Sequence, residues 1–327
     1  GPKAADWKLL GSFADIINPS FVCLSNTHPI IYAVSEQGPD VAAPKSVIKV
    51  IQYDPESFEM TVLQTVSAIG DAPCYISTDK EGRFLFVANY VSGNVVQYAI
   101  EKEGRLQPGI SAQHLGKGPH SRQEGPHAHY IRQHPTAELV YAIDLGIDQI
   151  IRYRPGNKGL EAMDTVHTET GSGPRHMVWH PNGTSAYILN ELTGSIEHWI
   201  WNDSLSQRNQ IVSLKPDFSE AFAGSADIHI DKSAQFVYAS LRGDFNEIVV
   251  LRVDPDTHDL SLIQRVAVGG EVPRNFAISP GEDYLAVALQ DSDKITLFSR
   301  DADTGLLSEV PEVVEVKTPV CVVYQEF

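Results

Sequence analysis

Apolar and polar positions alternate in short runs along the chain, and the same order of runs returns about every fifty residues. In one copy, an apolar run at residues 74–77 is followed by a polar turn, an aromatic and β-branched run at 84–88, and an alternating run at 94–98. Short runs bounded by Gly, Pro, Asn and Asp are typical of β-strands, and no stretch shows the 3.6-residue period of an amphipathic helix. The pattern predicts an all-β protein.

The repeat can be followed through seven starting positions. They lie 46–54 residues apart, at Pro19, Pro73, Pro126, Pro174, Ala226, Pro273 and Pro319. A four-stranded unit of about 45–50 residues is the size of one propeller blade. We therefore expect a seven-bladed β-propeller with four antiparallel strands per blade, in which residues 1–327 form a single domain.

The last copy is too short to make a blade of its own. It begins at Pro319, and the chain ends at Phe327, so it supplies one strand. We expect the closing blade to be built from both termini, with residues 7–13 as the N-terminal strand. An incomplete closing blade is the alternative.

Blade topology predicts where functional side chains lie. In an antiparallel blade, the connection into the first strand and the connection between the second and third strands share one face, and loops there can vary without disturbing the sheets. The residues that follow the starts of the repeats are Ser20, Cys74, His127, Arg175, Asp227, Arg274 and Val320. Polar or charged residues that end second strands include Tyr90, Asp144, Asn190, Glu191, Arg242 and Gln290.

The charge balance narrows the classes of ligand. The chain has 25 basic and 42 acidic residues, a net charge of −17, which argues against nucleic-acid binding. No apolar run approaches the ~20 residues of a membrane-spanning helix. Three widely spaced cysteines form neither a disulfide framework nor a zinc motif, and reduced thiols favour the cytoplasm.

Arginine on the predicted functional face is notable in a chain that is poor in cations. Arg175, Arg242 and Arg274 come from three separate repeats. The rigid and permanently charged guanidinium suits carboxylate or phosphate binding. We therefore expect an anion-binding centre at the mouth of the central channel.

Acid–base candidates lie on the same face. Glu191 is one, and His127, His129 and His176 are the others, because histidine can pass a proton in either direction near neutral pH. Motifs for serine hydrolases, metalloproteases and nucleotide binding are absent. We expect neither a metal nor an organic cofactor, and the oligomeric state is open.

Several segments resemble the lactonase family of seven-bladed propellers, which includes propeller-type 6-phosphogluconolactonases and fungal 3-carboxy-cis,cis-muconate lactonizing enzymes. The resemblance is carried by residues 122–129, 141–148, 173–183, 190–192, 273–278 and 290–293. It implies that His129 or His127, Arg175, Glu191 and Arg242 line the active site, with Arg274 adding anion binding. The chain departs from the family in its opening strands and in the fifth repeat, where Ala226-Asp227 replaces a Pro-Arg or Pro-His pair.

These observations lead to hydrolysis of a small anionic sugar lactone, for example 6-phosphogluconolactone, as the first hypothesis for function. In this reading Arg242, Arg274, Asn190, Asp144, Gln290 and Tyr90 bind the substrate. A muconate-type lactonizing cyclase is the second reading, in which the same site closes a lactone ring by adding a carboxylate across a double bond. A propeller that only binds a protein or glycan on its loop face is the third reading.

Overall fold

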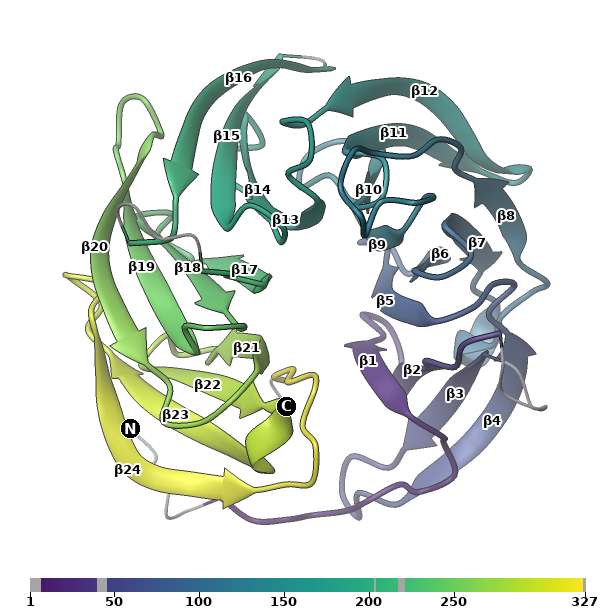
Figure 1. The fold of residues 1–327 in the computed structure, drawn as a ribbon. Helices are drawn as coiled ribbons and strands as arrows, with labels where there is room; N and C mark the ends of the chain where they lie inside the picture. Colours follow the sequence, from purple (N-terminus) through teal and green to yellow (C-terminus); the bar gives the residue numbers. More distant parts are fainter. Residues whose placement is uncertain (1–6, 40–45, 203, 217–220, 326–327) are drawn as a thin grey trace. The chain divides into compact units, whose positions relative to one another are not determined.

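The structure, a computed structural model, describes residues 7–39, 46–202, 204–216 and 221–325. These residues form six antiparallel sheets of four strands, and in each sheet the strands lie side by side in the order in which they follow along the chain (Figure 1). Such meanders arise because short turns join antiparallel neighbours. The all-β class and the four-stranded blade predicted from the repeat are confirmed.

The chain divides into two compact units. The N-terminal unit, Leu9–Gly171, holds three of the blades. Their strands are β1 Pro19–Leu24, β2 Ile30–Ser35, β3 Val47–Tyr53, β4 Met60–Ser67, β5 Pro73–Thr78, β6 Phe84–Asn89, β7 Asn94–Ala99, β8 Ile110–Gln113, β9 Ala128–Gln133, β10 Val140–Asp144, β11 Gln149–Gly156 and β12 Gly159–His167.

The C-terminal unit comprises the described residues from Ser172 onward, with Trp7 and Lys8. Its three blades contain β13 Pro174–Trp179, β14 Ser185–Asn190, β15 Ser195–Asn202, β16 Ser204–Ser213, β17 Ser225–Ile230, β18 Phe236–Leu241, β19 Glu247–Val253, β20 Leu260–Ala267, β21 Pro273–Ile278, β22 Tyr284–Leu289, β23 Lys294–Arg300 and β24 Leu307–Glu315. Two short 3₁₀ turns, Lys102–Gly104 and Gln290–Ser292, complete the regular structure of the described residues.

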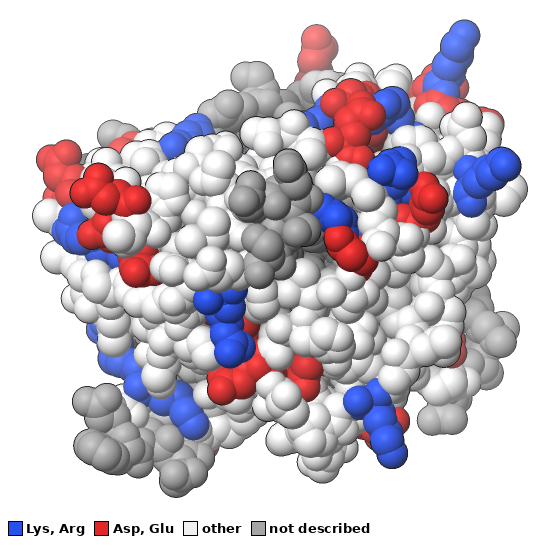
Figure 2. Space-filling view, turned by 90° about the horizontal axis from the view of Figure 1, so that it is seen from above, with Lys and Arg blue, Asp and Glu red and all other residues white. Residues whose placement is uncertain are grey.

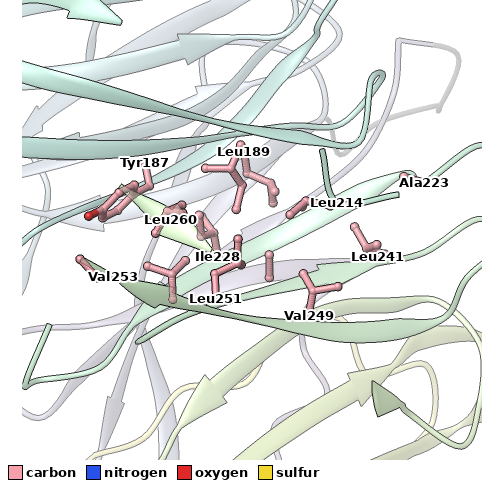
Figure 3. Close-up of a cluster of buried hydrophobic side chains, with 13 residues drawn as sticks. Tyr187, Leu189, Leu214, Ala223, Ile228, Leu241, Val249, Leu251, Val253 and Leu260 are labelled. Atoms are coloured by element: carbon pink, nitrogen blue, oxygen red, sulfur yellow. The ribbon is translucent and has the colours of Figure 1, made fainter. Parts of the chain in front are cut away.

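Apolar side chains between neighbouring blades form the core of each unit. In the C-terminal unit, Figure 3 shows Tyr187 and Leu189 of β14 facing Ile228, Leu241 and Leu251 of the next blade. These side chains are almost fully buried, and each contributes about 1.5–3 kcal/mol through removal of apolar surface from water. Packing of this kind places β13 against β17 and β17 against β21, so the first strands of the three blades are neighbours.

An irregularity near the start of the first strands positions the residues singled out by the repeat. Pro174 pairs with Asn190 and His176 with Leu189, so Arg175 is an extra residue in a β-bulge. Arg274 lies in the matching bulge of β21. In β17 the irregularity falls between Ser225 and Ile228 and contains Asp227. A bulge redirects a side chain out of the regular pleat, which is why polar residues can occupy this point of an otherwise apolar strand.

The two strands predicted for a closing blade are not formed. Residues 7–17 and 316–325 contain no strand, and the residues that the structure describes make six four-stranded sheets. Val322 and Tyr324 instead pack against buried side chains of the last blade, such as Leu297. The two expected strands are therefore not formed within the described residues, where the Val322 amide donates to Oδ1 of Asn275 at 2.6 Å instead of to a neighbouring strand, and a seventh blade stays a prediction.

Charged side chains are mixed on the surface. Figure 2 shows acidic and basic residues next to each other in small groups among neutral side chains on the face in view. Exposed pairs such as Arg154–Glu161, 3.2 Å apart, are of this kind. No helix among the described residues is long and apolar enough to cross a membrane.

Candidate functional site

An arginine–glutamate cluster lies at the start of the C-terminal unit. Arg175 comes from the bulge of β13, Glu191 directly follows β14, and Arg242 directly follows β18. Oε2 of Glu191 lies 3.1 Å from Nε of Arg175 and 3.1 Å from Nη2 of Arg242. All three side chains are largely buried, with 17% of Arg242 exposed. The structure therefore brings together three of the residues predicted from the sequence.

Backbone carbonyls fix the two guanidiniums in place. Nη1 of Arg175 donates to the carbonyl oxygen of Ala226, and Nε of Arg242 donates to that of Gly224 at 2.7 Å. Arg175 is thus bound to β17, the first strand of the next blade, and Arg242 is bound to the loop that leads into that strand. The loop carrying Glu191 is held in the same way, because the Glu191 amide donates to the carbonyl of Gly173 at 2.8 Å.

Positive charge is in excess in this part of the molecule. Arg274 is close enough to Arg175 to lower its pKa, and Nη1 of Arg274 lies 3.4 Å from Oε1 of Gln290. Burial and the charge of Arg242 lower the pKa of Arg175 to about 10, although Glu191 acts in the opposite direction. Three guanidiniums face two carboxylates, Glu191 and Asp227, so an anionic ligand would relieve this repulsion.

Asp227 connects this cluster to two histidines. Its Oδ1 lies 2.9 Å from Nδ1 of His176, and its Oδ2 lies 3.0 Å from Nε2 of His229. Nδ2 of Asn275 donates to Oδ2 at 2.5 Å. Burial alone would raise the pKa of Asp227, but attraction to His229 and hydrogen bonds from both histidines hold it well below its ordinary value. The carboxylate is therefore ionised throughout the neutral range.

His176 uses both of its ring nitrogens within the cluster. With Nδ1–H donating to Asp227, Nε2 is the acceptor for Nη1 of Arg175 at 3.2 Å. Burial and the positive charge of Arg175 lower the pKa of His176 to about 4, against the opposing effect of Asp227. This geometry indicates that His176 is a neutral histidine that links Arg175 to Asp227, and it argues against proton exchange between His176 and substrate.

The other predicted acid–base histidines lie in the N-terminal unit. The rings of Tyr90 and His127 stack with centroids 4.5 Å apart, and His129 meets Tyr90 edge-on at 5.5 Å. Nδ1 of His127 is 2.9 Å from the carbonyl oxygen of Tyr90, and Nε2 is 3.3 Å from the carboxylate of Glu124. These three predicted residues form an aromatic and imidazole group of their own.

Asp144 and Asn190, predicted to bind substrate, bind the protein itself. Both are fully buried. Oδ1 of Asp144 accepts from the His127 amide at 2.6 Å, and Oδ2 lies 2.6 Å from Nδ1 of His114. Nδ2 of Asn190 donates to Oγ of Ser195 at 3.0 Å. Their place at the ends of second strands is as expected, but in this geometry they fix the turns beside the site.

Three polar residues of the cluster, Asp227, His229 and Asn275, lie outside the set of site residues chosen from the sequence. His229 of β17 and Asn275 of β21 both contact Asp227. Asn275 follows Arg274 in β21 and is buried among the apolar residues of that strand, and a polar residue at a buried strand position was the available signal. His229 stands two residues beyond Asp227, on the same side of the strand. Within the described ranges there is no group of three or more histidine, cysteine or acidic side chains that could hold a metal ion.

Known proteins resemble this chain over nearly its whole length. A 6-phosphogluconolactonase of Bacillus subtilis is 34% identical over 313 residues, which is 94% of this chain and 88% of that protein. A 6-phosphogluconolactonase of Formosa agariphila is 31% identical over 324 residues, covering 95% and 89% of the two chains. The solved structure of a periplasmic gluconolactonase of Pseudomonas aeruginosa superposes with a TM-score of 0.88 at 30% identity, covering 92% of this chain and 86% of that one.

The family of this chain follows from a match that covers nearly all of its residues. Residues 2–324 match the family described as lactonase, 7-bladed beta-propeller. The segments that carry the resemblance in the sequence lie within this range, and they include Arg175 and Glu191 of the arginine–glutamate cluster. The chain belongs to the lactonase family of β-propellers.

Proposed function

We propose that this protein hydrolyses a lactone bearing an anionic group, with 6-phosphogluconolactone as the first substrate to test. The observation that carries the proposal is the arginine–glutamate cluster, in which Arg175 and Arg242 share one carboxylate oxygen and Arg274 adds a third positive charge. The names of the relatives from Bacillus subtilis and Formosa agariphila support the same reaction.

Hydrolysis of an anionic lactone needs stabilisation of the oxyanion and binding of the anionic group, and the cluster can supply both. Lactone opening develops negative charge on the carbonyl oxygen when water adds to the carbonyl carbon, and a well-placed donor stabilises such an oxyanion by about 3–4 kcal/mol. Arg175 and Arg242 are held for this task by backbone carbonyls and by Glu191. Arg274 and Gln290 would bind the anionic group of the substrate. No step requires a metal or an organic cofactor.

The roles of the remaining predicted residues are part of the proposal. Glu191 provides the counter-charge that keeps the two guanidiniums together, or takes a proton from the attacking water. His127, His129 and Tyr90 lie in the N-terminal unit, and their part in proton transfer or substrate binding stays a prediction. The proposed partner is therefore a small anionic lactone.

The decisive experiment follows lactone opening by acid release, corrected for spontaneous hydrolysis, in the wild type and in Arg175→Ala and Glu191→Gln. We expect both variants to lose at least a hundredfold in kcat/KM. Arg175→Ala removes one of the guanidiniums that stabilise the oxyanion, and Glu191→Gln removes the carboxylate that holds both of them. Arg154→Ala is the matched control, because the Arg154 side chain pairs with exposed Glu161, far in sequence from the cluster. Wild-type rates in both cluster variants would refute the proposal.

A cyclase remains as the second candidate, because the same excess of guanidiniums would hold a tricarboxylate muconate. The two activities separate in one comparison: ring opening releases acid, whereas cyclisation of a muconate removes the absorbance of its conjugated diene. A propeller that only binds another molecule would turn over neither substrate.

We also propose that the chain forms a single domain, a seven-bladed propeller like the family that it matches, and that the protein acts in the cytoplasm. The repeat and the family support the first statement, and the free cysteines support the second. The Pseudomonas aeruginosa relative is periplasmic, so fractionation of cells that express the full-length protein is the test of location.

A further inference from the structure

We propose that His229, held by Asp227, is the catalytic residue that moves the proton during lactone hydrolysis. The inference rests on the proposed function and assigns the acid–base step to a residue outside the set predicted from the sequence.

The Asp227 carboxylate determines which nitrogen of His229 carries the proton. An ionised carboxylate can only accept hydrogen bonds, so Nε2 of His229, 3.0 Å from Oδ2, must be the protonated nitrogen. Asn275 Nδ2 and the amide of Phe276 also donate to Oδ2, and the Ile228 amide donates to Oδ1. The carboxylate is therefore fixed by several donors and cannot easily turn away. Nδ1 of His229 is left with its lone pair.

His229 is partly exposed to solvent, unlike the carboxylate that holds it. Its side chain is 37% exposed, whereas Asp227 is 5% exposed. The ring is held edge-on against Phe276 with centroids 4.7 Å apart. Within the part of the chain that the structure describes, Nδ1 of His229 has no hydrogen-bond partner in the protein. A buried carboxylate behind an exposed imidazole is the arrangement that orients a general base and stabilises it when it becomes protonated.

The other groups of the cluster are already engaged. His176 is 4% exposed, and its two nitrogens contact Arg175 and Asp227. Glu191 is 4% exposed, and its Oε2 is shared by two guanidiniums. Of the acid–base groups in this cluster, His229 is the one with a lone pair that water can reach.

A continuous chain of contacts joins the base to the oxyanion donors. His229 contacts Asp227, Asp227 contacts His176, and His176 contacts Arg175, which reaches Glu191. This chain runs through buried side chains on neighbouring first strands, β13 and β17, so it fixes where the imidazole stands relative to the guanidinium. Asp227 and His176 are positioning residues in this arrangement.

The reaction step balances with one histidine. Nδ1 of His229 removes a proton from water as the water oxygen bonds to the lactone carbonyl carbon. The carbonyl electron pair moves to the oxygen, where Arg242 donates a hydrogen bond and the buried Arg175 adds its positive charge. When the intermediate collapses, the bond to the ring oxygen breaks, and the imidazolium returns the proton to that oxygen. The product is a hydroxy acid, which ionises and releases one proton to solvent.

The test compares lactone hydrolysis in the wild type, His229→Gln, His229→Ala and Asp227→Asn. Loss of a general base lowers kcat by about 10²–10⁴. We expect that loss in His229→Gln with KM changed less than threefold, and partial recovery of His229→Ala by added imidazole. Asp259→Asn is the matched control, because Asp259 lies 3.0 Å from Nδ1 of His198 in a histidine–aspartate pair outside the cluster, and it should keep the wild-type rate.

Nitrogen-15 NMR of histidine-labelled protein supplies a readout that a purely structural role would not move. In the wild type we expect the uncharged imidazole of His229 to carry its proton on Nε2. In Asp227→Asn we expect a mixture of the two tautomers. Wild-type kcat in His229→Gln, or a proton on Nδ1 in the neutral wild type, would overturn the assignment while leaving lactone hydrolysis intact. A wild-type enzyme that opens no lactone would instead refute the proposed function, and the catalytic role of His229 with it.

Discussion

Acidification should destabilise this protein through His176, and a single substitution can isolate the effect. Burial and Arg175 lower the pKa of His176 from 6.5 to about 4. A group with a lowered pKa in the folded state contributes stability that is complete above the unfolded pKa and is lost as the pH falls through the folded pKa. The contribution of His176 is therefore complete above about pH 6.5 and declines toward pH 4.

The magnitude follows from the same two values. Each pH unit between them is worth about 1.4 kcal/mol, so the wild type should lose about 3 kcal/mol of unfolding free energy through this group between neutral pH and pH 4. Burial also lowers the pKa values of His180 and His198, which adds to the loss in the same range. Asp227 contributes only at still lower pH, because its pKa lies below the ordinary 3.8.

Urea unfolding at a series of pH values, in the wild type and in His176→Gln, measures the difference. Glutamine can still donate to Asp227 but does not titrate. Between pH 6.5 and pH 4 the unfolding free energy of the variant should therefore fall by about 3 kcal/mol less than that of the wild type. The contributions of His180 and His198 are common to both proteins and cancel. His167→Gln, at an exposed position, should follow the wild type. Parallel curves for wild type and His176→Gln would refute the reasoning.

Two further predictions concern the supports of the site. Gly173→Ala should destabilise the fold by about 1–2 kcal/mol and lower lactone hydrolysis, because Gly173 has a φ of +60° and an added Cβ would lie 2.4 Å from Cγ of Leu192. Gly38→Ala, with nothing within 4 Å, is the control in chemical denaturation. Arg300→Ala should cost about 3–5 kcal/mol, since it strands the buried carboxylate of Asp231, 2.7 Å from Nη2 of Arg300. Arg154→Ala removes an exposed ion pair and should cost under about 1 kcal/mol when both variants are unfolded in urea. Equal losses in Arg300→Ala and Arg154→Ala would contradict the importance of the buried pair.

The sequence was informative wherever a local rule repeats along the chain. Alternation with a period of two, punctuated by Gly, Pro and Asp turns, is a property of each strand and its neighbours, so the strands and the four-stranded unit could be predicted. The position after the start of each repeat was also readable. The bulges that contain Arg175 and Arg274 give the reason, because they place a charged side chain at the same point of two blades.

What the sequence by itself determined was the repeat, the all-β class and the positions at which functional side chains emerge. Only the tertiary structure decided which of them meet. In the sequence Asp227 departs from the pattern of the repeats. In the structure it binds His176 of one blade and Asn275 of another, and it also holds the ring of the partly exposed His229. Asp144 and Asn190 looked like binding residues, yet they are buried. The physical reason is that hydrogen-bond partners and burial come from strands of other blades, and a single strand's sequence does not record them.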